Sequence, residues 1–248
     1  MNRTLTAGIL GTLLCAGCAS GPSVPIRTLI VTGDDVDVHK WQETAPALAR
    51  LFVDSGKFRV TQCDDTKILG SPDALKLYDL IVLDYYNAHQ PTIPDEAKAN
   101  LVEFVKGGKG LVTVHLSSAA FAEWDEFHKM TGRYWKMQTS GHGPRGPFKA
   151  VIADKEDPIT RGLSDFEAND ELYAKLQGDE PIHVLVTADS DFSHKTEPLA
   201  FTVQYGKGRV YHHAFGHDVK AIREPATVAK LFVRGAEWAA TGKVTPDK

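Results

Sequence analysis

The sequence predicts an α/β fold in which a mostly parallel sheet lies between two layers of helices. First, apolar runs alternate with amphipathic helical patterns from residue 26 onward. Second, these runs are apolar on both faces, as strands covered by helices on both sides must be. Third, the chain has 248 residues, of which 42% are hydrophobic and 24% charged, so it can bury a full core. This combination is typical of a flavodoxin-like three-layer sandwich.

In the first half of the chain, strands and helices alternate. The strands are expected at residues 26–33, 58–63, 78–86 and 109–118. The helices are expected at residues 44–56, 93–108 and 119–130. The second of these helices has clear boundaries, because a proline and two acids open it and a glycine pair ends it.

The second half contains more strands than helices. Residues 132–147 are rich in Gly, Pro, Ser and Thr and predict a long loop. Further strands are expected at residues 148–154, 182–189, 198–206 and 208–215, and a closing helix at 224–240. The sequence shows no internal repeat, so residues 26–241 are interpreted as one domain, with a flexible tail at 242–248.

The first residues predict export. One arginine, an apolar stretch and small residues are typical of a signal peptide, here at residues 1–18. The stretch LLCAGC resembles the lipobox of bacterial lipoproteins, in which the final cysteine, Cys18, is lipidated; plain cleavage near residues 19–20 is the alternative. A short linker follows at 19–25. These features indicate the bacterial cell envelope, as an outer-membrane lipoprotein facing the periplasm or a soluble periplasmic protein, with membrane contact only through the lipid anchor.

Charge and cysteine content exclude other classes of protein. The formal net charge is -4 and the sequence has no long basic run, so nucleic-acid binding is not expected. Cys63 is the one cysteine of the predicted domain, so no disulfide framework is expected. The sequence leaves homo-oligomerisation open.

Polar side chains gather where four of the predicted strands end. They are His39 and Trp41; Asp84, Tyr85 and Tyr86; His115, Ser117 and Ser118; and His212, His213, His217 and Asp218. Because parallel strands end at one edge of a sheet, we expect these groups to share a crevice there. The adjacent His212 and His213 point to opposite faces and cannot form a chelating pair. Taken singly, each histidine could also be a hydrogen-bonded strand cap.

With these residues in place, the chain resembles the ThuA-like family, the trehalose-utilisation group of the class I glutamine amidotransferase-like superfamily. The resemblance is carried, in order, by HKWQETAPAL, YDLIVLDYYN, GGKGLVTVHLSSAAFAEW, SGHGPRGPF, DPITRGLSDFEANDELY, TEPLAF and YGKGRVYHHAFGHD. It implies the superfamily's fold. The catalytic cysteine of the amidotransferases has no counterpart in VHLSSAAF, so glutamine hydrolysis is not expected.

The strand ends and the resemblance together define an expected site. The expected metal ligands are His115, His142 and His217, for a divalent ion of the zinc type. The expected catalytic groups are Glu171, Glu197, His212 and Asp218, with Glu171 or Glu197 as general base. The expected substrate-binding residues are His39, Trp41, Tyr86 and Tyr173. Without a metal, the same groups could act as acid and base, and no nucleotide cofactor is expected.

The resemblance implies a role with carbohydrates. The interpretation is an exported enzyme acting on a sugar or keto-sugar, an isomerase, lyase or hydrolase of 3-keto-glycosides that a metal ion could assist. The alternative is a non-catalytic sugar-binding envelope lipoprotein that kept the fold and lost turnover.

Overall fold

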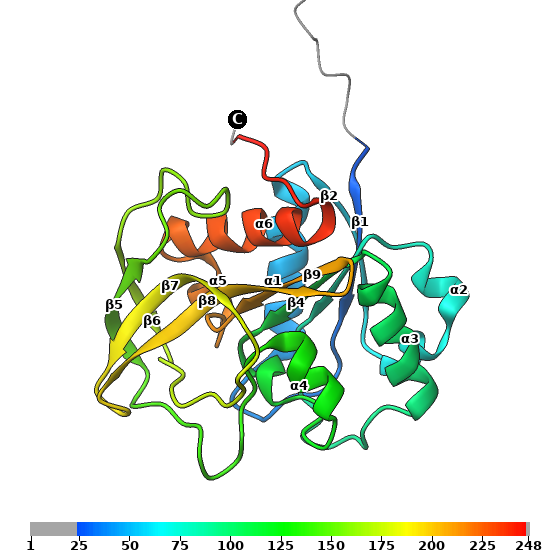
Figure 1. Cartoon of the computed structure of the whole chain (residues 1–248), viewed down its shortest axis with the longest axis horizontal. Helices are drawn as coiled ribbons and strands as arrows, with labels where there is room; N and C mark the ends of the chain where they lie inside the picture. Colours follow the sequence, from blue (N-terminus) through cyan, green and yellow to red (C-terminus); the bar gives the residue numbers. More distant parts are fainter. Residues whose placement is uncertain (1–23, 247–248) are drawn as a thin grey trace, which may run out of the picture.

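A single mixed sheet forms the centre of the molecule. The computed structural model describes residues 24–246, in which nine strands are ordered β2-β1-β3-β4-β9-β8-β7-β5-β6 (Figure 1). The expected signal peptide, with Cys18, lies outside the described residues. Across residues 24–246, no helix is both long enough and apolar enough to cross a lipid bilayer.

One half of the sheet is parallel, as predicted. It contains β2 (Phe58–Cys63), β1 (Ile26–Val31), β3 (Leu80–Leu83), β4 (Gly110–Val114) and β9 (Gly208–His213). Each neighbouring pair in this half runs in parallel. Every residue of β3 and β4 is buried, which explains their uninterrupted apolar sequences.

The other half is antiparallel, so the expectation of a mostly parallel sheet is wrong. It contains β8 (Lys195–Tyr205), β7 (His183–Ser190), β5 (Gly146–Ile152) and β6 (Phe166–Asp170). The pairs from β9 to β6 all run antiparallel. The reason lies in the connections: no helix separates these strands, and a short connection can only return the chain in the opposite direction.

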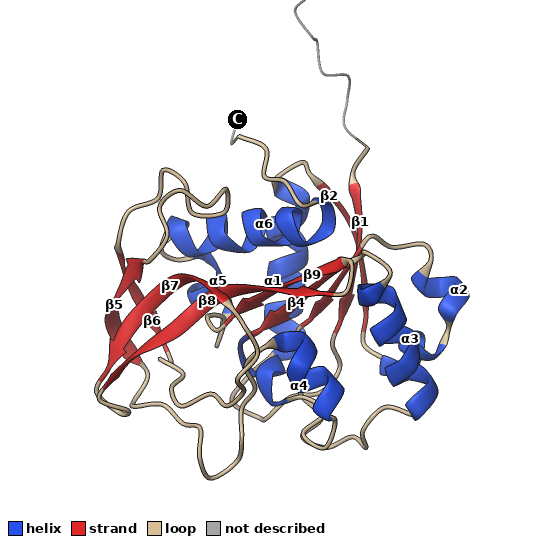
Figure 2. Ribbon diagram, in the orientation of Figure 1, coloured by secondary structure: helices blue, strands red, loops and turns tan. Residues whose placement is uncertain are grey.

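Helices cover both faces of the sheet, which confirms three layers (Figure 2). On one face, α1 (Trp41–Asp54) and α6 (Ala226–Thr241) pack with the short α5 (Val219–Arg223). On the other face lie α2 (Pro72–Leu75), α3 (Asp95–Lys106) and α4 (Asp125–Thr131).

Some elements differ from those expected. The helix expected at 119–130 is reduced to α4, because the chain leaves β4 in a single 3₁₀ turn (His115–Ala119) and then adopts an extended conformation at Ala120. Strand β6 was not expected from the sequence. In the expected tail, the Thr245 amide and hydroxyl both donate to Glu237 of α6, so this part lies against the domain.

His212 and His213 lie in the core on opposite faces of β9, as strand alternation predicts. The His212 ring stacks on Phe201, with ring centroids 4.4 Å apart, and the His213 ring stacks on Phe232 at 3.7 Å. Both histidines are fully buried, and burial lowers the pKa of each to about 3.

These buried histidines predict a loss of stability in acid. The folded protein keeps both rings neutral until about pH 3, whereas the unfolded chain protonates them below about pH 6.5. The unfolded state therefore binds more protons between these limits. The free energy of unfolding should fall by about 1.4 kcal/mol per pH unit for each histidine as the pH decreases through this window.

The variant His213→Phe isolates one of these contributions. Urea unfolding at several pH values should give a slope smaller by about one proton than in the wild-type protein, whatever the cost of packing the larger ring. The exposed His194, replaced by alanine, is the control, because its ring is in water in both states. An unchanged slope for His213→Phe would contradict the assignment.

Candidate metal centre

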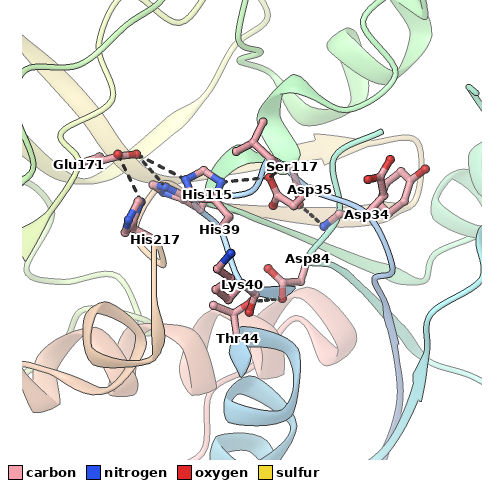
Figure 3. A network of polar contacts seen from close by, with 12 residues as sticks. Asp34, Asp35, His39, Lys40, Thr44, Asp84, His115, Ser117, Glu171 and His217 are labelled. Carbon is pink, nitrogen blue, oxygen red and sulfur yellow. Dashed lines mark hydrogen bonds and ion pairs between the residues drawn. The ribbon is translucent and has the colours of Figure 1, made fainter. Parts of the chain in front are cut away.

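Four side chains converge beyond the sheet edge where the parallel strands end. His39 follows β1, His115 follows β4, Glu171 follows β6 and His217 follows β9 (Figure 3). Their ligand atoms all lie within 4.8 Å of one another. The expectation that distant imidazoles and acids share one place therefore holds for these four residues, which we call the His–Glu cluster.

The Glu171 carboxylate lies at the centre of the cluster. Its Oε2 is 3.3 Å from His115 Nε2 and 3.6 Å from His39 Nε2, and its Oε1 is 3.3 Å from His217 Nδ1. Burial opposes ionisation of this carboxyl, but the three imidazoles outweigh burial and hold its pKa well below the usual range. Glu171 is thus an anion that requires positive charge beside it.

His39 is oriented by an acid on its own loop. Its Nδ1 is 3.0 Å from Asp35 Oδ1, which directs Nε2 toward Glu171. Burial favours the neutral ring, yet the contacts with Asp35 and Glu171 raise the pKa of His39 to about 9. A carboxylate behind a histidine that faces a charged site is the arrangement that fixes metal-binding histidines in proteins.

His115 occupies a sharp elbow after β4. Its backbone has φ 48°, an unusual left-handed conformation for a residue other than glycine. Its Nδ1 donates to the Ala214 carbonyl at 2.7 Å, which directs Nε2 toward the cluster. The Tyr173 hydroxyl lies 2.9 Å from Nε2, and the two rings stack. The strained turn thus presents an imidazole to the cluster.

Buried Asp170 shapes the backbone around Glu171 and His217. One oxygen accepts the Gly216 amide at 2.7 Å, and the other accepts the Glu171 amide at 2.8 Å and the His217 amide at 3.4 Å. Burial raises the pKa of Asp170, and these amides oppose that shift. The side chain therefore fixes two members of the cluster through their main chains.

The cluster suits a divalent transition-metal ion. His39 Nε2 and His217 Nδ1 are buried and make no hydrogen bond, although both face Glu171. Buried polar atoms normally find a partner, and a cation held between these two nitrogens and the carboxylate would give each of them one. Three imidazole nitrogens and one carboxylate are ligands that zinc and its first-row neighbours accept.

Ser117 has a structural role. Its hydroxyl donates to the Leu83 carbonyl at 2.8 Å and accepts the Tyr85 amide at 2.9 Å, which ties the elbow to the end of β3. Nearby, buried Asp84 accepts the Thr44 hydroxyl at 2.8 Å, and burial raises its pKa to about 7. Both groups support the elements that carry His39 and His115 (Figure 3).

Several expected site residues are not members of the cluster. His212 is in the core, stacked on Phe201, and so is not at the cluster. Glu197 is a buried residue of β8. Its carboxylate accepts the Lys175 amide at 3.0 Å and so holds the loop that follows Glu171. Asp218 caps α5 and pairs with Arg145. Trp41 begins α1, and Tyr86 packs against the core.

Two expected residues lie beside the cluster, and one contributor was missed. His142 Nε2 is 3.6 Å from Glu171, but His39, expected to bind substrate, takes its place among the four converging residues. Tyr173 contacts His115, as described above. Asp35 was missed, and its only signal is the acid-rich run before His39. Trp135, on the loop before His142, has its ring 4.8 Å from that of Tyr173.

Fold and site together define a class: a three-layer α/β protein with a mixed sheet, whose strand-end elbow carries a histidine. A glutamine amidotransferase from Thermotoga maritima has the same fold, with a TM-score of 0.50 and 13% identity over 88% of this chain and 99% of its own. The chain belongs to the ThuA family, described as Trehalose utilisation, whose profile matches residues 27–239. A carbohydrate-related role follows from this membership.

Solved structures of similar proteins agree with this assignment. A protein described as ThuA-like from Parabacteroides merdae ATCC 43184 is 30% identical, with a TM-score of 0.79, over 91% of this chain and 93% of its own. A second, from Bacteroides uniformis ATCC 8492, is 17% identical, with a TM-score of 0.70, over 92% and 96%. A search of curated proteins gave no match.

The Asp170 hydrogen bonds predict a specific cost of substitution. Asp170→Asn replaces an acceptor with a donor that faces backbone amides, so the free energy of unfolding should fall by about 1–3 kcal/mol. Asp73→Asn is the control, because Asp73 is exposed and its loss should change stability by less than about 0.5 kcal/mol. Urea titration measures both, and equal stability of the two variants would contradict the role of Asp170.

Proposed function

We propose that this chain is a carbohydrate-active enzyme that uses a divalent metal ion bound by the His–Glu cluster. The observation that carries the proposal is the convergence of three imidazoles on the Glu171 carboxylate in a buried setting, where His39 Nε2 and His217 Nδ1 make no hydrogen bond. Family membership supports a carbohydrate substrate. The three imidazoles and the carboxylate support metal-assisted chemistry.

The four residues would hold the ion through His39 Nε2, His115 Nε2, His217 Nδ1 and a Glu171 oxygen. When bound, such an ion polarises a sugar carbonyl or lowers the pKa of a water molecule. Asp35 and the Ala214 carbonyl orient His39 and His115 through their other ring nitrogens. The Tyr173 hydroxyl, 2.9 Å from His115 Nε2, would give up this contact when the ion is bound.

Proton transfer falls to His142 in this proposal. Its Nδ1 contacts the Gly143 carbonyl at 2.7 Å, so Nε2, which lies 3.6 Å from Glu171, is the atom that exchanges a proton with substrate. The His142 side chain is more exposed than the four ligands and can meet a substrate at the opening. The partly exposed Trp135 presents an aromatic surface beside it, which suits the apolar face of a sugar ring.

The reaction class proposed is isomerisation, elimination or hydrolysis of a 3-keto-glycoside. Polarisation of a ketone together with a proton carrier serves each of these, because all three remove or add a proton next to a carbonyl or a leaving group. The competing proposal is a sugar-binding protein without turnover. Export to the envelope also stays a proposal, which rests on the sequence of residues 1–18 alone.

The metal proposal predicts binding that depends on Glu171. The purified chain, dialysed against Zn²⁺ or Co²⁺ and measured by mass spectrometry, should hold about one ion per chain. Glu171→Gln and His115→Ala should weaken binding more than about a hundredfold, and Asp35→Asn about 10- to 100-fold. The matched control is Glu197→Gln, which keeps an acceptor for the Lys175 amide and should bind normally. Binding that is as strong in Glu171→Gln as in the control would remove the metal proposal.

Catalysis predicts conversion of a keto-sugar. In a panel of 3-ketoglucosides, the wild-type protein should alter at least one compound, and Glu171→Gln should lower kcat by at least about a hundredfold. Chromatography of the products measures this. A sugar that raises Tm and is recovered unchanged would support the binding protein instead.

A further inference from the structure

The His–Glu cluster is almost closed, and its exposure increases toward one side. The side chains of His115 and His39 are 4% and 7% exposed, those of Glu171 and His217 are 11% and 13% exposed, and that of His142 is 32% exposed. The opening therefore lies between the loop that carries His142 and the turn that carries His217.

A short segment, residues 142–145, borders this opening; we call it the mouth loop. It is anchored before and after: the preceding Gly141 exchanges two backbone hydrogen bonds with Ala174, and the following Gly146 enters β5. A side chain at Gly141 would collide with the Phe192 ring, so that end is held tightly. In the described part of the chain, no backbone hydrogen bond ties residues 142–145 to another segment.

One ion pair connects the mouth loop to the opposite side. Arg145 Nη2 is 2.7 Å from Asp218 Oδ2, and Asp218 directly follows His217. The two side chains are 33% and 40% exposed, so the pair spans the opening in contact with water. An ion pair of this exposure contributes little free energy, so it can open readily.

We propose that Arg145 is a positioning residue, whose ion pair with Asp218 holds the mouth loop closed over the cluster and keeps His142 beside Glu171. Without the pair, residues 142–145 keep only the side-chain contacts of His142 with Glu171, Trp135 and Tyr173, so the loop can move and His142 moves with it. Passage into and out of the site then depends on this contact. The part of the test that uses a metal ion rests on the proposed function.

The variants separate the ion pair from the other roles of these residues. Arg145→Ala removes the guanidinium, and Arg145→Lys restores a positive charge. Asp218→Asn removes the charge but leaves an oxygen to accept the Ala221 amide at the start of α5. Arg50→Ala is the control, because it breaks an exposed ion pair of similar length, with Asp54, on α1.

The first measurement needs no metal. Diethyl pyrocarbonate modifies accessible imidazoles, and peptide mass spectrometry follows His217 relative to the exposed His194. Modification of His217 should be about two- to fivefold faster in Arg145→Ala and Asp218→Asn than in the wild-type protein. It should be close to wild type in Arg145→Lys and Arg50→Ala. Equal rates in all five proteins would overturn the proposal.

The second measurement follows release of Co²⁺ to excess chelator. Opening should accelerate uptake and release by the same factor, so Kd stays unchanged; a merely structural role would raise Kd instead. One molar NaCl should accelerate release from the wild-type protein and not from Arg145→Ala, because salt screens an exposed pair. A raised Kd that comes from faster release with unaltered uptake would contradict the positioning role. If Co²⁺ does not bind but His217 modification still accelerates, the mouth-loop inference stands and the metal proposal fails.

Discussion

A buried carboxylate surrounded by three imidazoles is the constraint on which the rest of this site depends. An ionised group away from water is costly unless opposite charge or hydrogen bonds compensate it. Here the compensation comes from His39, His115 and His217, which reach Glu171 from loops after three different strands. Hydrogen bonds with the main chain hold these side chains in place. Asp170 accepts the amides of Glu171 and Gly216, and the Ala214 carbonyl accepts from His115.

The mixed sheet explains why the cluster forms at this edge. The parallel half supplies the three histidines, because β1, β4 and β9 run in the same direction and end on the same side of the sheet, with β3 between β1 and β4. The antiparallel half supplies the carboxylate: β6 is the far edge strand, and the chain after it returns over the end of β9 (Figure 1). Neither half alone contains the donor set. The site therefore requires both the parallel and the antiparallel half of the sheet.

Much of this could be predicted from the sequence, and the exceptions have physical reasons. Apolar runs predicted most of the strands. Because His39, His115 and His217 follow strands that were predicted to be parallel, they were expected to be neighbours. The direction of the later strands could not be predicted, since burial on two faces does not encode direction. His212 and Glu197 are polar residues near the right ends, but one points into the core and the other is used by a backbone amide. Asp170 and Asp35 act through contacts that no local pattern specifies.

The direct test of the central claim is the ligand environment of an ion added to the protein. X-ray absorption spectroscopy of the Co²⁺- or Zn²⁺-loaded chain reports the donor atoms, and scattering from imidazole rings reports how many histidines bind. The account predicts about three imidazoles with oxygen donors in the wild-type protein, and about two imidazoles in His39→Ala. A shell made only of oxygen, or one that is unchanged when His39 is replaced, would contradict the account.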